Sequence, residues 1–133
     1  MKFPRQLFLF GLVGAIGFTV DTAILYLVSE SIGLYFGRLL SFMTSVLATW
    51  ILNRNLTFAD RRSDKPKYHE LTIYFLLMTL GGLVNYSTYA ILIHHNTLVH
   101  QQPVLGVAAG SLAGMLLNLF SARYFLFKLR PQK

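Results

Sequence analysis

Six hydrophilic side chains stand within or at the ends of long apolar stretches, and their chemistry suits ligand binding: Asp21, Asn53, Arg54, Asn85, Asn118 and Arg123. An ionised carboxylate inside a bilayer costs about 2.5–3.5 kcal/mol on insertion scales, so we expect Asp21 to face other helices or a hydrated cavity. The three asparagines suit either ligand binding or hydrogen bonds between helices: Asn53, Asn85 and Asn118. A guanidinium binds phosphate oxygens bidentately, so Arg54 and Arg123 suit a phosphate group, although arginines at helix ends also hold topology.

The composition indicates a membrane protein. Of 133 residues, 54% are hydrophobic and 13% are charged, against about 25% charged in a typical soluble domain. The chain has no cysteine, which excludes disulfides, thiolate nucleophiles and cysteine-based zinc sites. His94, His95 and His100 have no carboxylate beside them, and no nucleotide-binding or catalytic motif is present. We therefore expect no enzymatic activity, no metal and no cofactor.

Four apolar stretches organise the chain, at about residues 7–28, 35–52, 71–93 and 104–122. Each approaches the roughly 20 residues that an apolar layer about 30 Å thick requires. Backbone groups in lipid must be satisfied internally, so these stretches are predicted to be helices. The sequence thus predicts one domain, residues 1–133, that is an all-α membrane protein with four transmembrane helices. The first helix is expected to remain uncleaved.

The basic residues predict how the chain is oriented. The net charge is +7, but the cations flank apolar stretches, which argues against nucleic-acid binding. Eleven of the 12 lysines and arginines precede the first stretch, follow the second or follow the fourth: Lys2, Arg5, Arg54, Arg61, Arg62, Lys65, Lys67, Arg123, Lys128, Arg130 and Lys133. Both termini and the central loop should therefore be cytoplasmic. Within that loop, Arg61, Arg62, Lys65 and Lys67 are expected at the surface, near lipid headgroups.

A weak internal repeat relates the two halves. Phe10, Gly17 and Asp21 align with Tyr74, Gly81 and Asn85, and at a second offset Arg54 and Phe58 align with Arg123 and Phe127. Each half is predicted to be a helical hairpin that enters from the same side, which makes the repeats parallel and places their pseudo-twofold axis along the membrane normal. A coincidence of hydropathy is the alternative.

Rows of small and polar residues at four-residue spacing lie on one face of each predicted helix. The rows are Gly17 and Asp21, with Gly14 a turn below; Ser41, Ser45, Thr49 and Asn53; Gly81 and Asn85; and Gly106, Gly110, Gly114 and Asn118. Helices in lipid associate where small residues permit close approach, so these rows are expected to face one another. The glycine row of the last helix suits either packing within the chain or a homodimer, and we favour the dimer.

These residues resemble the GtrA-like family over nearly the whole chain. The resemblance rests on Phe10-Gly11-Leu12-Val13-Gly14 and Asp21, on Asn53-Arg54-Asn55-Leu56-Thr57-Phe58, and on Asn118 with Arg123-Tyr124-Phe125-Leu126-Phe127. It implies a protein of the bacterial inner membrane that moves a polyprenyl-phosphate-linked monosaccharide to the outer leaflet, for cell-surface glycosylation, beside a membrane glycosyltransferase. Arg54 and Arg123 would then meet the phosphate, and Asp21, Asn53, Asn85 and Asn118 would meet the sugar.

Two other functions compete with translocation. A non-transporting scaffold that recruits a membrane glycosyltransferase would depend on the outer surface of the helices more than on Asp21, Asn118 or Arg123. A small multidrug exporter would have a glutamate in the first membrane helix and little bias in its basic residues. The sequence has neither exporter feature, so the scaffold is the main alternative.

Overall fold

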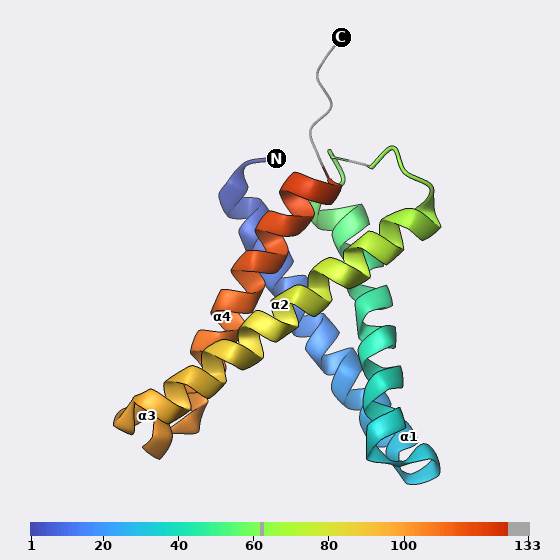
Figure 1. Cartoon of the computed structure of the whole chain (residues 1–133). Coiled ribbons are helices and arrows are strands. Elements are labelled where there is room, and N and C mark those ends of the chain that lie inside the picture. The colour runs from blue at the N-terminus through green and yellow to red at the C-terminus, as the bar shows by residue number, and fades with distance from the viewer. Residues whose placement is uncertain (62, 128–133) are drawn as a thin grey trace. The chain divides into compact units, whose positions relative to one another are not determined.

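A computed structural model describes residues 1–61 and 63–127, and every regular element among them is helical. In chain order the elements are α1 (Phe3–Leu52), the π-helix η1 (Asn53–Thr57), α2 (Lys67–His95), α3 (Thr97–Gln101), α4 (Pro103–Ser121) and the π-helix η2 (Ala122–Leu126), as Figure 1 shows. The chain forms two compact units. Unit 1 contains Met1–Leu71 and Phe127, and unit 2 contains Thr72–Leu126.

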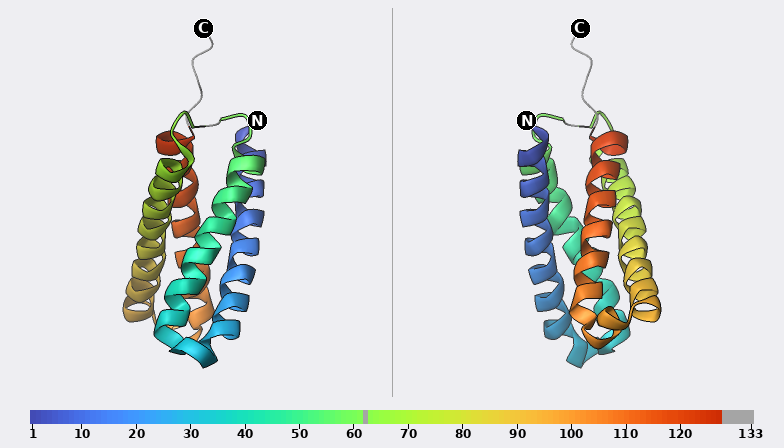
Figure 2. Two further views of the ribbon diagram at one scale, coloured as in Figure 1. Left: turned by 90° about the vertical axis from the view of Figure 1, so that its right-hand side faces the viewer. Right: turned by 90° about the vertical axis from the view of Figure 1, so that its left-hand side faces the viewer.

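In unit 1, α1 consists of two helical arms that fold back on each other at Gly33 (Figure 2). Gly33 has φ 78° and ψ 169°, a backbone conformation that disfavours a Cβ atom and therefore favours glycine. The predicted helices at 7–28 and 35–52 fall in the two arms. Ser41 and Ser45 of the second arm contact Asp21 and Gly17 of the first, so the arms run antiparallel.

In unit 2, α2 is followed by the short helix α3 and by α4. Asn96 caps α3, since its side-chain oxygen accepts a hydrogen bond of 3.1 Å from the backbone N–H of Val99. Pro103 occupies the first turn of α4, where its missing N–H costs no helical hydrogen bond. The predicted helices at 71–93 and 104–122 correspond to α2 and to α4 with the first residue of η2.

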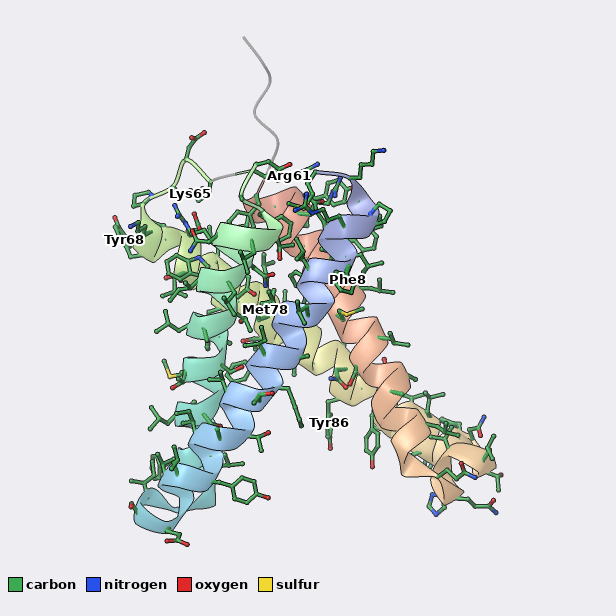
Figure 3. All side chains as sticks on the ribbon, turned by 180° about the vertical axis from the view of Figure 1, so that it is seen from behind. Phe8, Arg61, Lys65, Tyr68, Met78 and Tyr86 are labelled. Carbon is green, nitrogen blue, oxygen red and sulfur yellow. The ribbon has the colours of Figure 1, made fainter. Side chains whose placement is uncertain are left out.

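The outer surface of the helices is apolar. Phe18, Tyr26 and Leu27 are 72%, 76% and 75% exposed, and Phe8 and Tyr86 also lie at the surface (Figure 3). Phe3–Val28 and Lys67–His95 are long and apolar enough, by length and composition, to cross a bilayer. Several polar side chains are instead fully buried, among them Gln6, Ser41 and Glu70. This reversal of the soluble pattern suits helices that are surrounded by lipid.

Each half ends in a π-helix that contains one of the two arginines aligned in the repeat. Arg54 is the second residue of η1, and Arg123 is the second residue of η2. In η1 the backbone N–H of Phe58 donates to the carbonyl of Asn53 at 2.8 Å, a bond that spans five residues rather than the four of an α-helix. Phe58 and Phe127 follow the two π-helices and are fully buried. The predicted repeat is therefore visible in local structure.

Candidate functional site

Asp21 lies within the first arm of α1 and is half-buried. The hydroxyl of Ser41, which is fully buried, donates a hydrogen bond of 2.6 Å to Asp21 Oδ1. A serine hydroxyl is a suitable donor to a carboxylate in an apolar setting, because a bond to a charged group compensates part of the cost of desolvation. As predicted, Asp21 is directed at a neighbouring helical arm.

The small residues of unit 1 form the predicted seam between the arms. Ser45 Oγ donates to the carbonyl oxygen of Gly17 at 2.8 Å, and a Cβ atom at Gly17 would lie 3.2 Å from Ser45 Oγ and closer still to Thr49. Only glycine permits this approach. At Gly14, which was expected a turn below this pair, no described atom lies within 4 Å of the position of a Cβ atom. Gly14 lies one helical turn from Gly17, and the close contact between the arms is formed at Gly17.

Unit 2 contains an equivalent seam between α2 and α4. A Cβ atom at Gly81 would clash with the side chain of Asn118, and one at Gly110 would lie 2.6 Å from Asn85 Oδ1. A Cβ atom at Gly114 would lie 2.7 Å from the carbonyl oxygen of Gly81. Asn118 Oδ1 is buried, with no hydrogen-bond partner among the described residues. The rows on these helices therefore face each other, as the sequence predicts.

The glycine row of α4 is used for packing inside unit 2. Beyond the contacts of Gly110 and Gly114 with α2, a Cβ atom at Gly106 would lie 3.0 Å from both Tyr89 and Val99. The packing alternative is the one that the structure supports. A homodimer would need a different surface, and dimerisation itself stays a prediction.

Arg54 forms an ion pair that the sequence did not suggest. Its Nε donates to Glu70 Oε1 at 2.9 Å, and the indole Nε1 of Trp50 donates to the same oxygen at 2.9 Å. Glu70 is fully buried, whereas the Arg54 side chain is 17% exposed. The signal that could have found Glu70 is its position at the start of the third apolar stretch, where an acid needs a cation.

Asn53 is buried and forms a hydrogen bond within η1. It is 2% exposed, and its Oδ1 accepts a hydrogen bond of 2.7 Å from Thr57 Oγ1 within η1. This bond joins the first and last residues of the π-helix. Of the two roles left open for Asn53, the contacts favour the structural one.

Arg123 is half-buried in η2, in unit 2. Its guanidinium carbon lies 5.9 Å from the ring centroid of Tyr124, within the range of a cation–π interaction. Arg54 and Arg123 thus occupy matching positions in their π-helices but have different neighbours, a carboxylate for one and an aromatic ring for the other.

The six predicted residues divide equally between the units. Unit 1 contains Asp21, Asn53 and Arg54, and unit 2 contains the other three. Within unit 1, Ser41, the partner of Asp21, and Asn53 are separated by more than three helical turns, or about 18 Å along the second arm. The carboxylate and the guanidinium of unit 1 therefore lie at different depths along the seam.

The loop between α1 and α2 corrects one prediction. Arg61 was expected at the surface, but it is 8% exposed, and its backbone N–H donates to the carbonyl of Phe58 at 2.9 Å. The turn that follows η1 brings Arg61 inward, whereas Lys65 and Lys67 are exposed (Figure 3 labels Arg61 and Lys65). Four other predicted basic residues lie outside the described part of the chain: Arg62, Lys128, Arg130 and Lys133.

Two contacts gather the chain ends and the central loop at one end of unit 1. The ammonium of Met1 forms an ion pair with Asp60, and the ring of Phe127 stacks on that of Phe58. Partial burial acts to raise the pKa of Asp60, but the hydrogen bonds from the ammonium and from its own backbone, with the positive charges of the ammonium and Arg61, outweigh burial and lower the pKa. Met1 and Phe127 therefore both contact the segment between η1 and α2 within unit 1.

The apolar outer surfaces, the seams of small residues and the buried ion pair define a helical membrane protein. The family model of the GtrA/DPMS transmembrane domain matches residues 9–132, so the chain belongs to this family. The resemblance inferred from the sequence motifs is thereby confirmed. No curated protein matches the chain. Among the described residues, no group of histidine and acidic side chains could hold a metal ion.

Proposed function

We propose that the protein is a translocase that moves a polyprenyl-phosphate-linked monosaccharide from the cytoplasmic to the outer leaflet of the bacterial inner membrane. It crosses the membrane four times, as two parallel repeated hairpins, with both termini in the cytoplasm. Membership of the GtrA/DPMS transmembrane domain family supports this proposal. A membrane glycosyltransferase is the expected partner, and no cofactor is required.

The observation that carries the proposal is the half-buried carboxylate of Asp21 within an apolar helix. A charge at this depth is costly, and intramembrane acids characteristically line a substrate or ion path. Its Oδ1 accepts the hydrogen bond from Ser41, and each carboxylate oxygen can accept more than one hydrogen bond. We assign Asp21, Asn85 and Asn118 to the hydroxyl groups of the sugar, and Asn53 to shaping the end of the seam.

Arg54 and Arg123 are assigned to the phosphate. Each guanidinium has five N–H donors in a rigid fork, and the ion pair with Glu70 engages Arg54 through Nε. Each arginine is the second residue of the π-helix that follows α1 or α4, and we assign this position to the boundary between headgroups and hydrocarbon core. The prenyl chain would remain in lipid, beside the exposed apolar side chains.

The orientation can be tested with single cysteines because the chain has none of its own. Lys65→Cys in the central loop should react with an impermeant maleimide only when the cytoplasmic side is accessible. His95→Cys at the end of α2 should react from the opposite side. Reaction of both residues from one side would contradict the proposed topology.

The role of Asp21 is tested in vesicles that contain purified protein and a labelled prenyl-phosphate sugar. Asp21→Asn removes the charge with little change in shape and should reduce translocation by about tenfold or more, on the scale of one lost charge-assisted hydrogen bond. Glu30→Gln is the matched control, since Glu30 is an exposed acid on the same arm. Normal translocation by Asp21→Asn would remove the carboxylate from the mechanism. The scaffold would be favoured if Arg54 and Arg123 variants also translocated normally. In that case, only outer-surface changes such as Phe18→Ala should cause defects.

A further inference from the structure

Glu70 is a fully buried carboxylate with an unusual set of partners. It lies in the first turn of α2, and its Oε1 accepts both the indole N–H of Trp50 and the Nε–H of Arg54. Its other oxygen, Oε2, is buried without a hydrogen-bond partner among the described residues. One oxygen of the Glu70 carboxylate thus accepts two hydrogen bonds.

This arrangement holds the Arg54 side chain in place but leaves the hydrogen bonding of the Glu70 carboxylate incomplete. A carboxylate optimised for its own stability would take two parallel bonds from the guanidinium fork, one on each oxygen. Here the ion pair uses a single bond from Nε, 2.9 Å long. Trp50 fixes the accepting oxygen, and that oxygen in turn fixes Nε. The Arg54 side chain is the partly exposed member of the pair, so its remaining donors are the ones that a ligand can reach.

The repeat shows that packing at this position does not require a charge. The offset that aligns Phe10 with Tyr74 also aligns Gln6 with Glu70. Both side chains are fully buried, yet one is a neutral amide and the other an acid. Since a buried carboxylate is costly, its presence in only one half points to a task beyond packing.

We propose that Glu70 is a positioning residue that holds the Arg54 guanidinium for the phosphate of a prenyl-phosphate lipid. Trp50 orients Glu70, Glu70 binds Nε of Arg54, and the Nη groups of Arg54 bind the phosphate oxygens. This inference rests on the proposed function and specifies which end of the repeat first meets the phosphate. Positioning lowers the entropy that the arginine side chain loses when it binds a ligand.

The test measures affinity for two probes that differ only in charge, farnesyl phosphate and farnesol. Calorimetric titration of the purified full-length protein in detergent gives both dissociation constants. Trp50 is the single tryptophan of the chain, so a change in its fluorescence as farnesyl phosphate binds reports on this cluster. The wild-type protein should bind farnesyl phosphate more tightly than farnesol.

Glu70→Gln keeps the shape of the side chain and removes its charge. We expect it to raise the dissociation constant for farnesyl phosphate about tenfold, the scale of one charge-assisted hydrogen bond, and to leave that for farnesol unchanged. Trp50→Phe, which removes the donor to Glu70 and keeps an aromatic ring, should weaken farnesyl phosphate binding in the same direction by a smaller factor. It supplies the test if Glu70→Gln does not fold. Glu30→Gln, an exposed acid on α1, is the control and should match the wild type.

The alternatives give different results. Tighter binding of farnesyl phosphate by Glu70→Gln would mean that Glu70 competes with the phosphate for Arg54, and would overturn the inference. Unchanged affinity, or an equal loss for both probes, would make Glu70 structural and would also overturn it. A wild-type protein that does not distinguish farnesyl phosphate from farnesol would reject phosphate recognition itself, and hence the proposed function.

Discussion

The ring of Phe127 stacks on the ring of Phe58, with centroids 4.7 Å apart and planes inclined by 12°. The two residues occupy equivalent positions in the repeat, each directly after a π-helix, and both are fully buried. Phe10 meets Phe58 edge-on, with centroids 6.2 Å apart. Phe127 is thereby held in an aromatic cluster with Phe58 and Phe10 within unit 1.

This stack predicts a stability effect. Phe127→Ala should lower the free energy of unfolding by about 3–5 kcal/mol, because it leaves a cavity in a filled aromatic cluster. Phe125→Ala is the control, since Phe125 is 67% exposed and should change stability little. Chemical denaturation in detergent micelles measures both. Equal effects from the two variants would contradict a packed stack at this end.

Adjacent glycines in α2 give a matched pair. Gly81→Ala would place a methyl group against Asn118, whereas no described atom lies within 4 Å of the Cβ position at Gly82. Gly81→Ala should destabilise the protein by about 1–3 kcal/mol through overpacking. Gly82→Ala should be neutral or stabilise it by up to about 1 kcal/mol through helix propensity. Thermal unfolding in detergent distinguishes them, and the opposite order would refute the α2–α4 seam.

The turn between the arms of α1 depends on a positive φ at Gly33. Gly33→Ala should lower the free energy of unfolding by about 1–2 kcal/mol, since a Cβ atom is disfavoured in this conformation. Gly14→Ala, which meets no described atom within 4 Å, should cost nothing by comparison. Denaturant titrations of both variants in micelles measure the difference. A Gly33→Ala protein as stable as the wild type would show that the arms turn differently.

The hydrogen bond from Ser41 to Asp21 should affect both stability and transport. Ser41→Ala leaves Asp21 Oδ1 without this donor and should lower the free energy of unfolding by about 1.5–3 kcal/mol, as for bonds to charged groups. Thr44→Ala removes only a bond to the backbone carbonyl of Leu40 in the same arm and should have a smaller effect. Unfolding and lipid transport assays on the two variants provide the comparison. If Ser41→Ala lowered neither the free energy of unfolding nor the transport rate, the hydrogen bond from Ser41 to Asp21 would contribute to neither.

Regular features of this protein were predictable from the sequence because they follow from periodicity. Rows at four-residue spacing share a helix face, so the contacts of Gly17 with Ser45 and of Gly81 with Asn118 follow from spacing and residue size. The break near Gly33 follows from its place between two apolar stretches. Apolar length similarly indicated where the helices lie.

Local departures from helical periodicity were not predictable. The π-helices insert a residue at Arg54 and at Arg123, which changes the direction of the next side chains, and the phenylalanines that follow, Phe58 and Phe127, are fully buried. The same change turns Arg61 inward. Glu70 was overlooked because no periodic pattern links it to Arg54, which lies 16 residues earlier in the chain across an irregular loop.

Translocation is measured with the purified wild-type protein alone in vesicles, with a labelled prenyl-phosphate sugar in one leaflet and no glycosyltransferase present. The rate at which the label becomes accessible to an impermeant reagent on the other side measures translocation. A translocase should give a rate well above that of protein-free vesicles and proportional to the amount of protein. A rate equal to that of protein-free vesicles, from protein shown to be folded, would contradict translocation.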